Sequence, residues 1–407
     1  MDRKAIQAYA ERIEAELKQN ILPFWIRHTV DKKRGTFVGA LTNDLVVDPS
    51  AARGALLTAR ILWTYSSAYR RYRDAAYLEM AHLAYADLAN HFWDRDFGGF
   101  LWSIDAAGKP LKDRKQVYGQ AFGIYALTEY HLATGLAEPL NQAMTIFSLL
   151  EKYARDPQAG GYLEAFSREW KPIEDMRLSA VDLNEPKSQN THLHVMEAYS
   201  NLLRVRSDAT VRQSQSELID VMLNRILCKE SSHLKLFFAR DWTPKSDSIS
   251  YGHDIEAGWL LLEAARALRD SALIAQLTPL VLKIADGTLA EGVDADGALF
   301  NEGGPEGITN SNKEWWPQAE AVVGFIEAYQ LSGEERYLKA AFRCWDFIEK
   351  RLIDKKHGEW FRGVTREGTL LSDELKVSFW KCPYHNGRAC MEAASRLRAI
   401  ITTAGQH

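Results

Sequence analysis

Two kinds of long helical stretch alternate along the chain. The first kind, such as AAYLEMAHLAYADLANHFW at residues 75–93, has an apolar face and a charged face, which is typical of an outer helix buried on one side. The second kind, such as VYGQAFGIYALTEYHLATG at residues 117–135, is apolar nearly all round, as a fully buried helix should be. The sequence therefore predicts pairs of one outer and one inner helix.

A short turn signal separates these pairs: an aspartate, a few polar residues, a glycine, and then aromatic and apolar residues. It occurs at Asp31–Gly35, Asp94–Gly98, Asp156–Gly160, Asp294–Gly297 and Asp354–Gly358. Each copy predicts a turn followed by a short strand or hairpin. The glycines of neighbouring copies lie about 62 residues apart, and the longer gap from Gly160 to Gly297 has room for two units. We expect the missing copy at His233–Phe238 (HLKLFF), which has lost its glycine.

Six units of two helices with this period predict a closed toroid, an all-α (α/α)6 barrel with short β-hairpins in the connecting loops. An open solenoid is the alternative, but it would need polar capping repeats. Chance recurrence of the turn signal is the remaining alternative. The length of 407 residues alone suggests two or three domains, whereas the repeat predicts one catalytic domain over residues 1–407.

Composition narrows the possible partners and compartment. The net charge of -4, from 50 basic and 54 acidic side chains, is too balanced for nucleic-acid binding or a polybasic membrane anchor. The first 20 residues form an amphipathic charged pattern rather than a signal peptide, and no apolar run is long enough to span a membrane. The four cysteines form no CxxC or zinc spacing, so we expect reduced thiols in a cytoplasmic protein with no bound metal. It could be a monomer or a homodimer.

Unusual polar and aromatic residues fall near the starts of the expected inner helices. They are Arg60, Tyr118, Asn190, His194, His253, Trp315, Trp316, Trp380 and His385. Because equivalent points of a closed toroid converge on one end of its central cavity, these side chains predict a pocket there. The 12 tryptophans fit either sugar stacking or a large helical core.

Local spacing refines this pocket. Asn190 and His194 share a helix face, as do Trp316 and Glu320, because each pair is four residues apart. His253 and Glu256 are three apart, so we expect the carboxylate to hold the imidazole tautomer. His192, two residues from His194, should face elsewhere and be structural.

Three histidines, an arginine and tryptophan faces suit acid–base chemistry on a neutral polar substrate. Histidine titrates near neutral pH, so one ring can remove a proton while another delivers one. Removing a proton beside the aldehyde of an open-chain aldose creates an enediolate, which a fixed charge such as Arg60 would stabilise. Returning the proton to the other face inverts the carbon and needs no cofactor.

Five stretches carry a family resemblance: ARILWTYS (59–66), NTHLHVMEAY (190–199), GHDIEAGWLL (252–261), WWPQAEAVVGF (315–325) and WKCPYHNGRACMEA (380–393). In these the chain resembles the N-acylglucosamine 2-epimerase superfamily, and within it the cellobiose 2-epimerases. The resemblance implies an (α/α)6 barrel and cofactor-independent epimerisation at the second carbon of a reducing-end sugar, such as the glucose of cellobiose or lactose.

The resemblance also implies roles. His253 and His385 would be the base and acid, His194 would assist ring opening, and Glu256 would orient His253. Arg60 would hold the enediolate oxygens, together with Tyr118 and Asn190. The implied sugar contacts are Trp316, Trp380, Glu320 and, in the loop before the third inner helix, Asp182.

Several other functions remain possible at this point. Relatives of the same superfamily epimerise free mannose and glucose or isomerise an aldose to a ketose, and the loop of residues 170–189 is expected to influence substrate length. An (α/α)6 glycoside hydrolase could recruit Glu256 and Glu320 as its two carboxylates. A sugar-binding module without activity would need the tryptophans but not the histidines.

Overall fold

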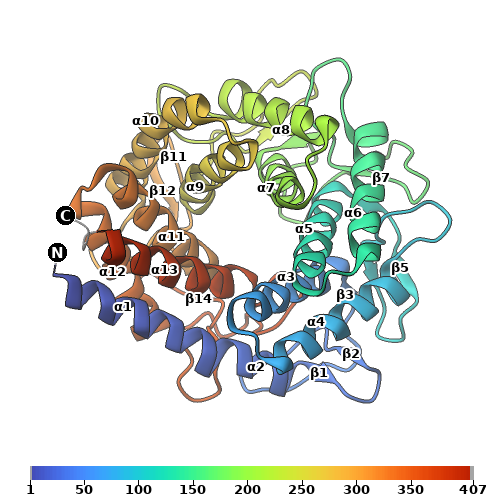
Figure 1. Cartoon of the computed structure of the whole chain (residues 1–407), viewed down its shortest axis with the longest axis horizontal. Coiled ribbons are helices and arrows are strands. Elements are labelled where there is room, and N and C mark those ends of the chain that lie inside the picture. The colour runs from blue at the N-terminus through green and yellow to red at the C-terminus, as the bar shows by residue number, and fades with distance from the viewer. Residues whose placement is uncertain (1, 404–407) are drawn as a thin grey trace.

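Buried helices form a closed inner ring in the computed structural model, which describes residues 2–403 (Figure 1). Within that range the ring consists of α3 (Ala55–Tyr72), α5 (Val117–Thr134), α7 (Gln189–Val205), α9 (Tyr251–Leu268), α11 (Trp315–Ser332) and α13 (Tyr384–Thr403). Each helix packs against the next, and α13 packs against α3, which closes the ring. The predicted (α/α)6 barrel is confirmed.

An outer layer of amphipathic helices surrounds this ring (Figure 1). It consists of α1 (Arg3–Ala15) with α2 (Leu22–His28), α4 (Ala75–Asp87), α6 (Ala137–Leu149), α8 (Ala209–Val221), α10 (Ser271–Gly287) and α12 (Glu335–Phe347). Each is extended by a π-helical turn: η1 (Glu16–Ile21), η2 (Leu88–Phe92), η3 (Leu150–Ala154), η4 (Met222–Ile226), η5 (Thr288–Gly292) and η6 (Ile348–Leu352). As predicted for residues 75–93, α4 buries one face, including Tyr77, Met80 and Ala84.

Short antiparallel strands connect neighbouring units. The pairs are β1 (Val30–Asp31) with β2 (Thr36–Phe37), β6 (Lys115–Gln116) with β7 (Ala165–Phe166), β8 (Lys187–Ser188) with β9 (Phe237–Phe238), and β13 (Lys313–Glu314) with β14 (Gly363–Val364). Two three-stranded sheets join β3 (Arg53–Gly54), β4 (Ser103–Ile104) and β5 (Pro110–Lys112), and β10 (Ile249–Ser250), β11 (Glu302–Gly304) and β12 (Gly307–Asn310). Most of these sheets join the strand before an inner helix to a strand of the following unit.

In four of the five copies the repeated aspartate fastens its turn to the segment before the next inner helix, whereas Asp31 pairs with Arg34 of its own turn. Asp94 accepts the backbone N–H of Asp96, and its carboxylate lies 2.8 Å from the Nζ of Lys115, a fully buried lysine just before α5. The same ion pair joins Asp156 to Lys187, Asp294 to Lys313 and Asp354 to Lys376. The turn signal is therefore structural.

The missing copy of this turn lies where the sequence indicates. The N–H of Cys228 donates to the carbonyl of His233, and Ser232 occupies the glycine position with a left-handed φ of 65°. Cys228 occupies the aspartate position here, and Ile249, just before α9, occupies the lysine position. The turn is held instead by Asp254 on α9, whose carboxylate lies 2.7 Å from Nδ1 of His233 and accepts the N–H of Leu234.

One outer segment differs from the sequence-based expectation about membranes. Among the described residues, Ser271–Gly292 is long and apolar enough to cross a membrane by length and composition alone. In the fold it forms α10 and η5, and it packs against α9 through Leu277, Val281 and Ile284. A single such helix is weak support for a membrane span, because helices of soluble proteins pass the same test.

Candidate active site

Position along each inner helix decides which way a side chain points. In the described chain, the fourth residues of four inner helices hold the backbone of the adjacent hairpin: Gln120, His192, Asp254 and Gln318. His192 shows the arrangement, because its Nδ1 lies 2.6 Å from the carbonyl of Ser188 while its Nε2 accepts the N–H of Tyr162. Burial lowers the pKa of His192 to about 4. His192 is structural, as predicted.

Two positions further along, a side chain has turned about 200° and faces the axis of the ring. In the first five inner helices the residues at this sixth position are Arg60, Phe122, His194, Glu256 and Glu320, and in α13 it is Ala389. All of them are buried. The four charged or titratable side chains among them form a polar layer across the centre of the barrel, which the sequence only partly predicts.

Above this layer, on the side of the helix starts, lies a cavity of about 520 Å³. Its walls include Asn190, His253 and Trp316 from the starts of α7, α9 and α11, together with Asp182 from the preceding loop. The ring of His253 lies 4.6 Å from that of Trp316, centroid to centroid. The carboxylate of Asp182 accepts the N–H of Ser179, a hydrogen bond within the loop. Four predicted site residues therefore line one cavity.

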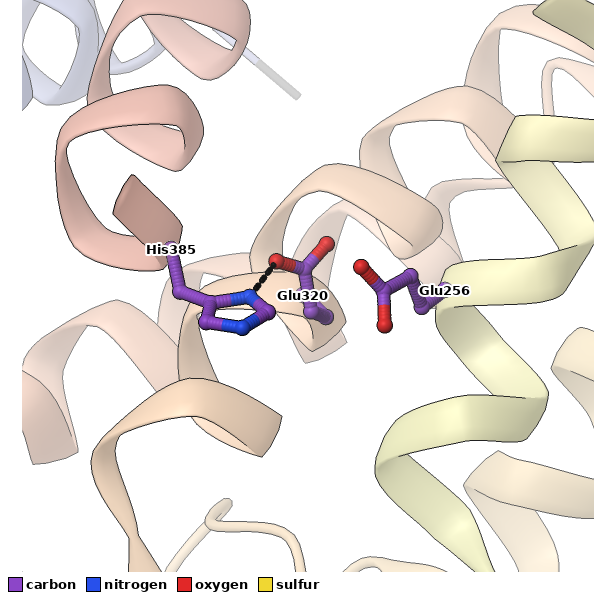
Figure 2. A group of neighbouring side chains, drawn as sticks. All are labelled: Glu256, Glu320 and His385. Carbon is purple, nitrogen blue, oxygen red and sulfur yellow. Dashed lines mark hydrogen bonds and ion pairs between the residues drawn. The ribbon is translucent and has the colours of Figure 1, made fainter. Parts of the chain in front are cut away.

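His385, the second residue of α13, also lies beside Trp316, with ring centroids 5.7 Å apart. Its Nδ1 lies 2.7 Å from a carboxylate oxygen of Glu320, as Figure 2 shows. Because an ionised carboxylate only accepts hydrogen bonds, Nδ1 carries the proton and Nε2 keeps a free lone pair. This tautomer makes His385 a base through Nε2.

His194 is held in the same manner by a neighbouring carboxylate. Its Nδ1 lies 2.9 Å from Glu197, which also accepts the hydroxyl of Tyr384 at 2.6 Å. The ring of Tyr118 stands edge-on to that of His194 at 5.1 Å. Arg60 donates to the Tyr118 hydroxyl at 2.6 Å, so the predicted oxyanion-binding residues Arg60 and Tyr118 are in contact.

Burial dominates the electrostatics of the three histidines. It lowers the pKa of His253 to about 3, and it lowers the pKa values of His194 and His385 as well. A charge on His194 would lower the pKa of both other rings further. The three imidazoles are thus close enough to influence one another and are neutral at pH 7.

Two of the expected contacts are wrong. Glu256 does not hold His253, whose Nδ1 instead lies 2.8 Å from the Oγ of Ser250. Glu256 accepts from Arg388 at 2.6 Å. Glu320, expected to touch the sugar, is fully buried and bonds His385, so it supports a histidine from behind.

The sixth inner helix also begins later than its motif suggests. Pro383 precedes its first residue, Tyr384, so Trp380 lies in the loop before α13 rather than on it. Trp380 is half-buried, with its ring 6.2 Å from that of Tyr118. It therefore still reaches the Arg60 side of the site.

Sequence analysis missed the central cation of this layer. Arg388 bonds Glu197, Glu256 and Glu320, and is itself almost completely buried. Its signal is in the sequence, because Arg388 follows His385 by three residues and therefore shares its helix face. Glu197 likewise follows His194 by three residues and shares its helix face.

One group of ligand atoms has the spacing of a metal site. Glu256, Glu320 and His385 each offer an atom within 4.8 Å of the others, and Figure 2 shows them facing one another. The guanidinium of Arg388 already lies 2.6 and 2.7 Å from the two carboxylates. A metal ion would be repelled by this fixed cation, so the residues do not fit a metal centre.

Comparison with known proteins identifies relatives over almost the whole chain. The family model of N-acylglucosamine 2-epimerase matches residues 35–389. The cellobiose 2-epimerase of Bacteroides fragilis is 46% identical over 94% of this chain and 97% of its own, and that of Dictyoglomus turgidum is 39% identical over 98% and 100%.

Solved structures agree. The cellobiose 2-epimerase from Bacillus thermoamylovorans superposes with a TM-score of 0.92 at 37% identity, covering 96% of this chain and 99% of that one. A D-mannose isomerase at 22% identity, with a TM-score of 0.83, shares the fold. The protein is accordingly a carbohydrate epimerase, an enzyme of the isomerase class. The chain belongs to the N-acylglucosamine 2-epimerase family.

Proposed function

We propose that this sugar 2-epimerase inverts the second carbon of the reducing-end glucose of β-1,4 disaccharides such as cellobiose and lactose, giving mannose at that position. The relatives named cellobiose 2-epimerase support the substrate class. The observation that carries the mechanism is that His253 on α9 and His385 on α13 both lie beside the ring of Trp316, on the two helices that flank α11.

The proton is moved by imidazole nitrogen. Nε2 of one histidine takes the hydrogen from the second carbon of the open-chain aldose, and the electron pair forms the enediolate double bond while O1 becomes negative. Reprotonation of the opposite face restores the aldehyde. His194 assists ring opening and closing, since its Nδ1 is occupied by Glu197 and its Nε2 is left for a sugar hydroxyl.

Two routes can return a proton to the second carbon. In the two-base route the second histidine, which is neutral in the free enzyme, first takes a proton from water and then gives it to the opposite face. In the one-base route the intermediate turns about a neighbouring C–C bond and the same ring returns the proton. Both routes use His253 and His385.

The negative charge on the enediolate is stabilised by fixed groups. Arg60 is buried and donates to Tyr118, so its charge acts in a low-dielectric region where electrostatic stabilisation is strong. The starts of α7, α9 and α11 also meet at the cavity, and their positive dipole ends favour an anion there. Asn190 adds a side-chain amide on the same wall.

Room for a second sugar comes from the loop at residues 176–185. Met176, Leu178 and Leu183 line the cavity together with Asp182, on the side away from the polar layer. A disaccharide would place its reacting glucose against His253 and its second ring under this loop. A free hexose would leave that part of the cavity to water.

Deuterium labelling tests the proposal most directly. The enzyme should convert cellobiose in D₂O to an intact disaccharide that carries mannose at its reducing end, with deuterium at the second carbon, as NMR would show. Full deuteration of the product in a single turnover would support the two-base route, and partial retention of hydrogen the one-base route. Free glucose would indicate hydrolysis. A disaccharide with fructose at its reducing end would indicate an isomerase. Turnover of mannose or N-acetylglucosamine alone would contradict the disaccharide assignment.

A substitution tests the base. His385→Ala should lower kcat by at least about 10³-fold, because the proton-transfer group itself is removed, while the thermal unfolding temperature stays close to that of the wild type. His131→Ala, at the exposed end of α5, is the matched control and should retain full activity. Ordinary turnover by His385→Ala would refute the role of this residue.

A further inference from the structure

A second cavity lies at the opposite end of the inner ring. Its volume is about 400 Å³, within the range of small-molecule sites. Its walls come from the later halves of the inner helices, including Arg70 on α3, Glu129 on α5, Asn201 and Arg204 on α7, and Glu263 on α9. The polar layer, through Glu197 and Arg388, is its floor and separates it from the His253 cavity.

Most charges on this wall are paired. Arg70 lies 2.5 Å from Glu129, and Arg204 lies 3.3 Å from Glu263. Arg71 pairs with Glu392, and Arg388 with Glu197. The fifth arginine of the wall, Arg73, lies over the ring of Tyr69. A small anion would meet four carboxylates and a small cation five guanidiniums, so a single charge of either sign is opposed. A neutral molecule escapes both penalties.

The paired groups keep unused hydrogen-bonding capacity. A guanidinium has five N–H donors and a carboxylate about four acceptor positions, more than each pair consumes. Within the described residues, Trp63 Nε1 and Arg388 Nε are buried donors without a hydrogen-bond partner, and both residues line this cavity. Leaving such groups unpaired costs about 1–3 kcal/mol each. A ligand that donates and accepts at many points would use the remaining donors and acceptors of the paired groups.

Aromatic side chains complete the wall. Trp63, Tyr125 and Trp259 line the cavity among the charged pairs. Hydroxyl groups are donors and acceptors at once, and the C–H faces of a sugar ring pack on aromatic surfaces. We propose that this second cavity is a binding site for a neutral polyhydroxylated molecule, a mono- or disaccharide, distinct from the His253 cavity.

The site does not depend on the proposed epimerisation. Its lining comes from different turns of the helices, and its occupation needs no open aldehyde. Glu197 nevertheless connects this cavity to the candidate active site, because it lines the cavity and also bonds His194.

Binding is tested with cellobiitol, the alditol of cellobiose, which has no aldehyde and cannot turn over. The ¹⁵N-labelled indole signals of Trp63 and Trp316 report on the two cavities and are assigned with Trp63→Phe and Trp316→Phe. Titration of the wild-type protein should shift the Trp63 signal saturably, with a midpoint different from that for Trp316. A shift confined to Trp316, or a shift of Trp63 with inorganic phosphate but not with cellobiitol, would overturn the proposal.

A cavity-filling variant gives a second readout. Ser67 is a small residue of α3 on the cavity wall, so Ser67→Leu should fill the site without removing a charge. It should weaken the Trp63 response at least tenfold while the Trp316 response is kept. An unchanged Trp63 titration in a variant with normal thermal unfolding would contradict the assignment, and failure to epimerise any sugar would leave this test unaffected.

Discussion

At the scale of single residues, the site depends on imidazoles kept neutral by burial. His253, His194 and His385 each lie in the polar layer or at its edge, where desolvation disfavours the charged ring. A neutral ring is the form that can accept a proton. Burial therefore keeps these residues in the form that the proposed first step requires.

This environment predicts the acidic limb of the pH profile. Because the base must be neutral, activity falls as pH drops through its pKa, and that pKa is lowered from an ordinary value of about 6.5. We expect kcat/KM to decline only well below pH 6.5, measured with cellobiose between pH 4 and 8. Half-maximal kcat/KM at pH 6.5 or above on the acidic side would show that the base is an exposed, unshifted group.

Residue spacing predicted which side chains lie close together, but it did not predict every hydrogen bond between them. His253 and Glu256 share a helix face, yet the carboxylate turns to Arg388. A full positive charge attracts a buried carboxylate more strongly than a neutral imidazole does. Arg388 comes from a helix over 100 residues away, so its competition is invisible in local spacing.

At the scale of elements, the repeated turns explain why the sequence signal contains a glycine. The glycine position needs a left-handed backbone, and in the fourth unit Ser232 holds it at φ 65° with a buried hydroxyl that has no hydrogen-bond partner among the described residues. For an L-residue other than glycine this conformation costs about 1–2 kcal/mol.

Ser232→Gly should therefore stabilise the protein by about 1 kcal/mol, after the entropic cost of glycine in the unfolded chain is deducted. The measurement is the midpoint of urea unfolding. Ser232→Ala is the matched control, because it removes the unpaired hydroxyl but keeps the backbone strain, and it should gain less. A loss of stability in Ser232→Gly would show that the turn is not strained.

For the buried ion pairs of the turns, we predict that a substitution lowers the stability of the protein. Lys115→Met leaves the buried carboxylate of Asp94 with only Arg168, and breaking such a pair costs about 3–5 kcal/mol. Urea unfolding of Lys115→Met should show a loss of that order. Lys339→Met, which removes an exposed pair on α12, should be unchanged within error. Equal effects of the two substitutions would mean that burial does not set the strength of these pairs.

At the scale of the whole molecule, closure of the ring joins the two ends of the chain. α1 packs against α13, so the N-terminal helix covers the last inner helix (Figure 1). Because each inner helix of the described chain packs against the next, the ring does not divide into weakly connected parts. The expectation of one domain leads to a further prediction.

Thermal unfolding should occur in a single cooperative transition, with calorimetric and van't Hoff enthalpies that agree. Differential scanning calorimetry at neutral pH, without ligand, would measure both. Two resolved transitions, or a van't Hoff enthalpy well below the calorimetric one, would indicate separate units within the ring.

The sequence by itself determined the fold and the end of the barrel at which we propose the site. A repeat of about 62 residues and the contrast between amphipathic and fully apolar helices are local properties, and they suffice to predict a closed double ring. They also bring His194, His253 and His385 near equivalent helix starts. Only the tertiary structure decided how the buried charges pair, because Arg388 bridges carboxylates from three other helices and each pairing depends on which opposite charge lies nearest in space.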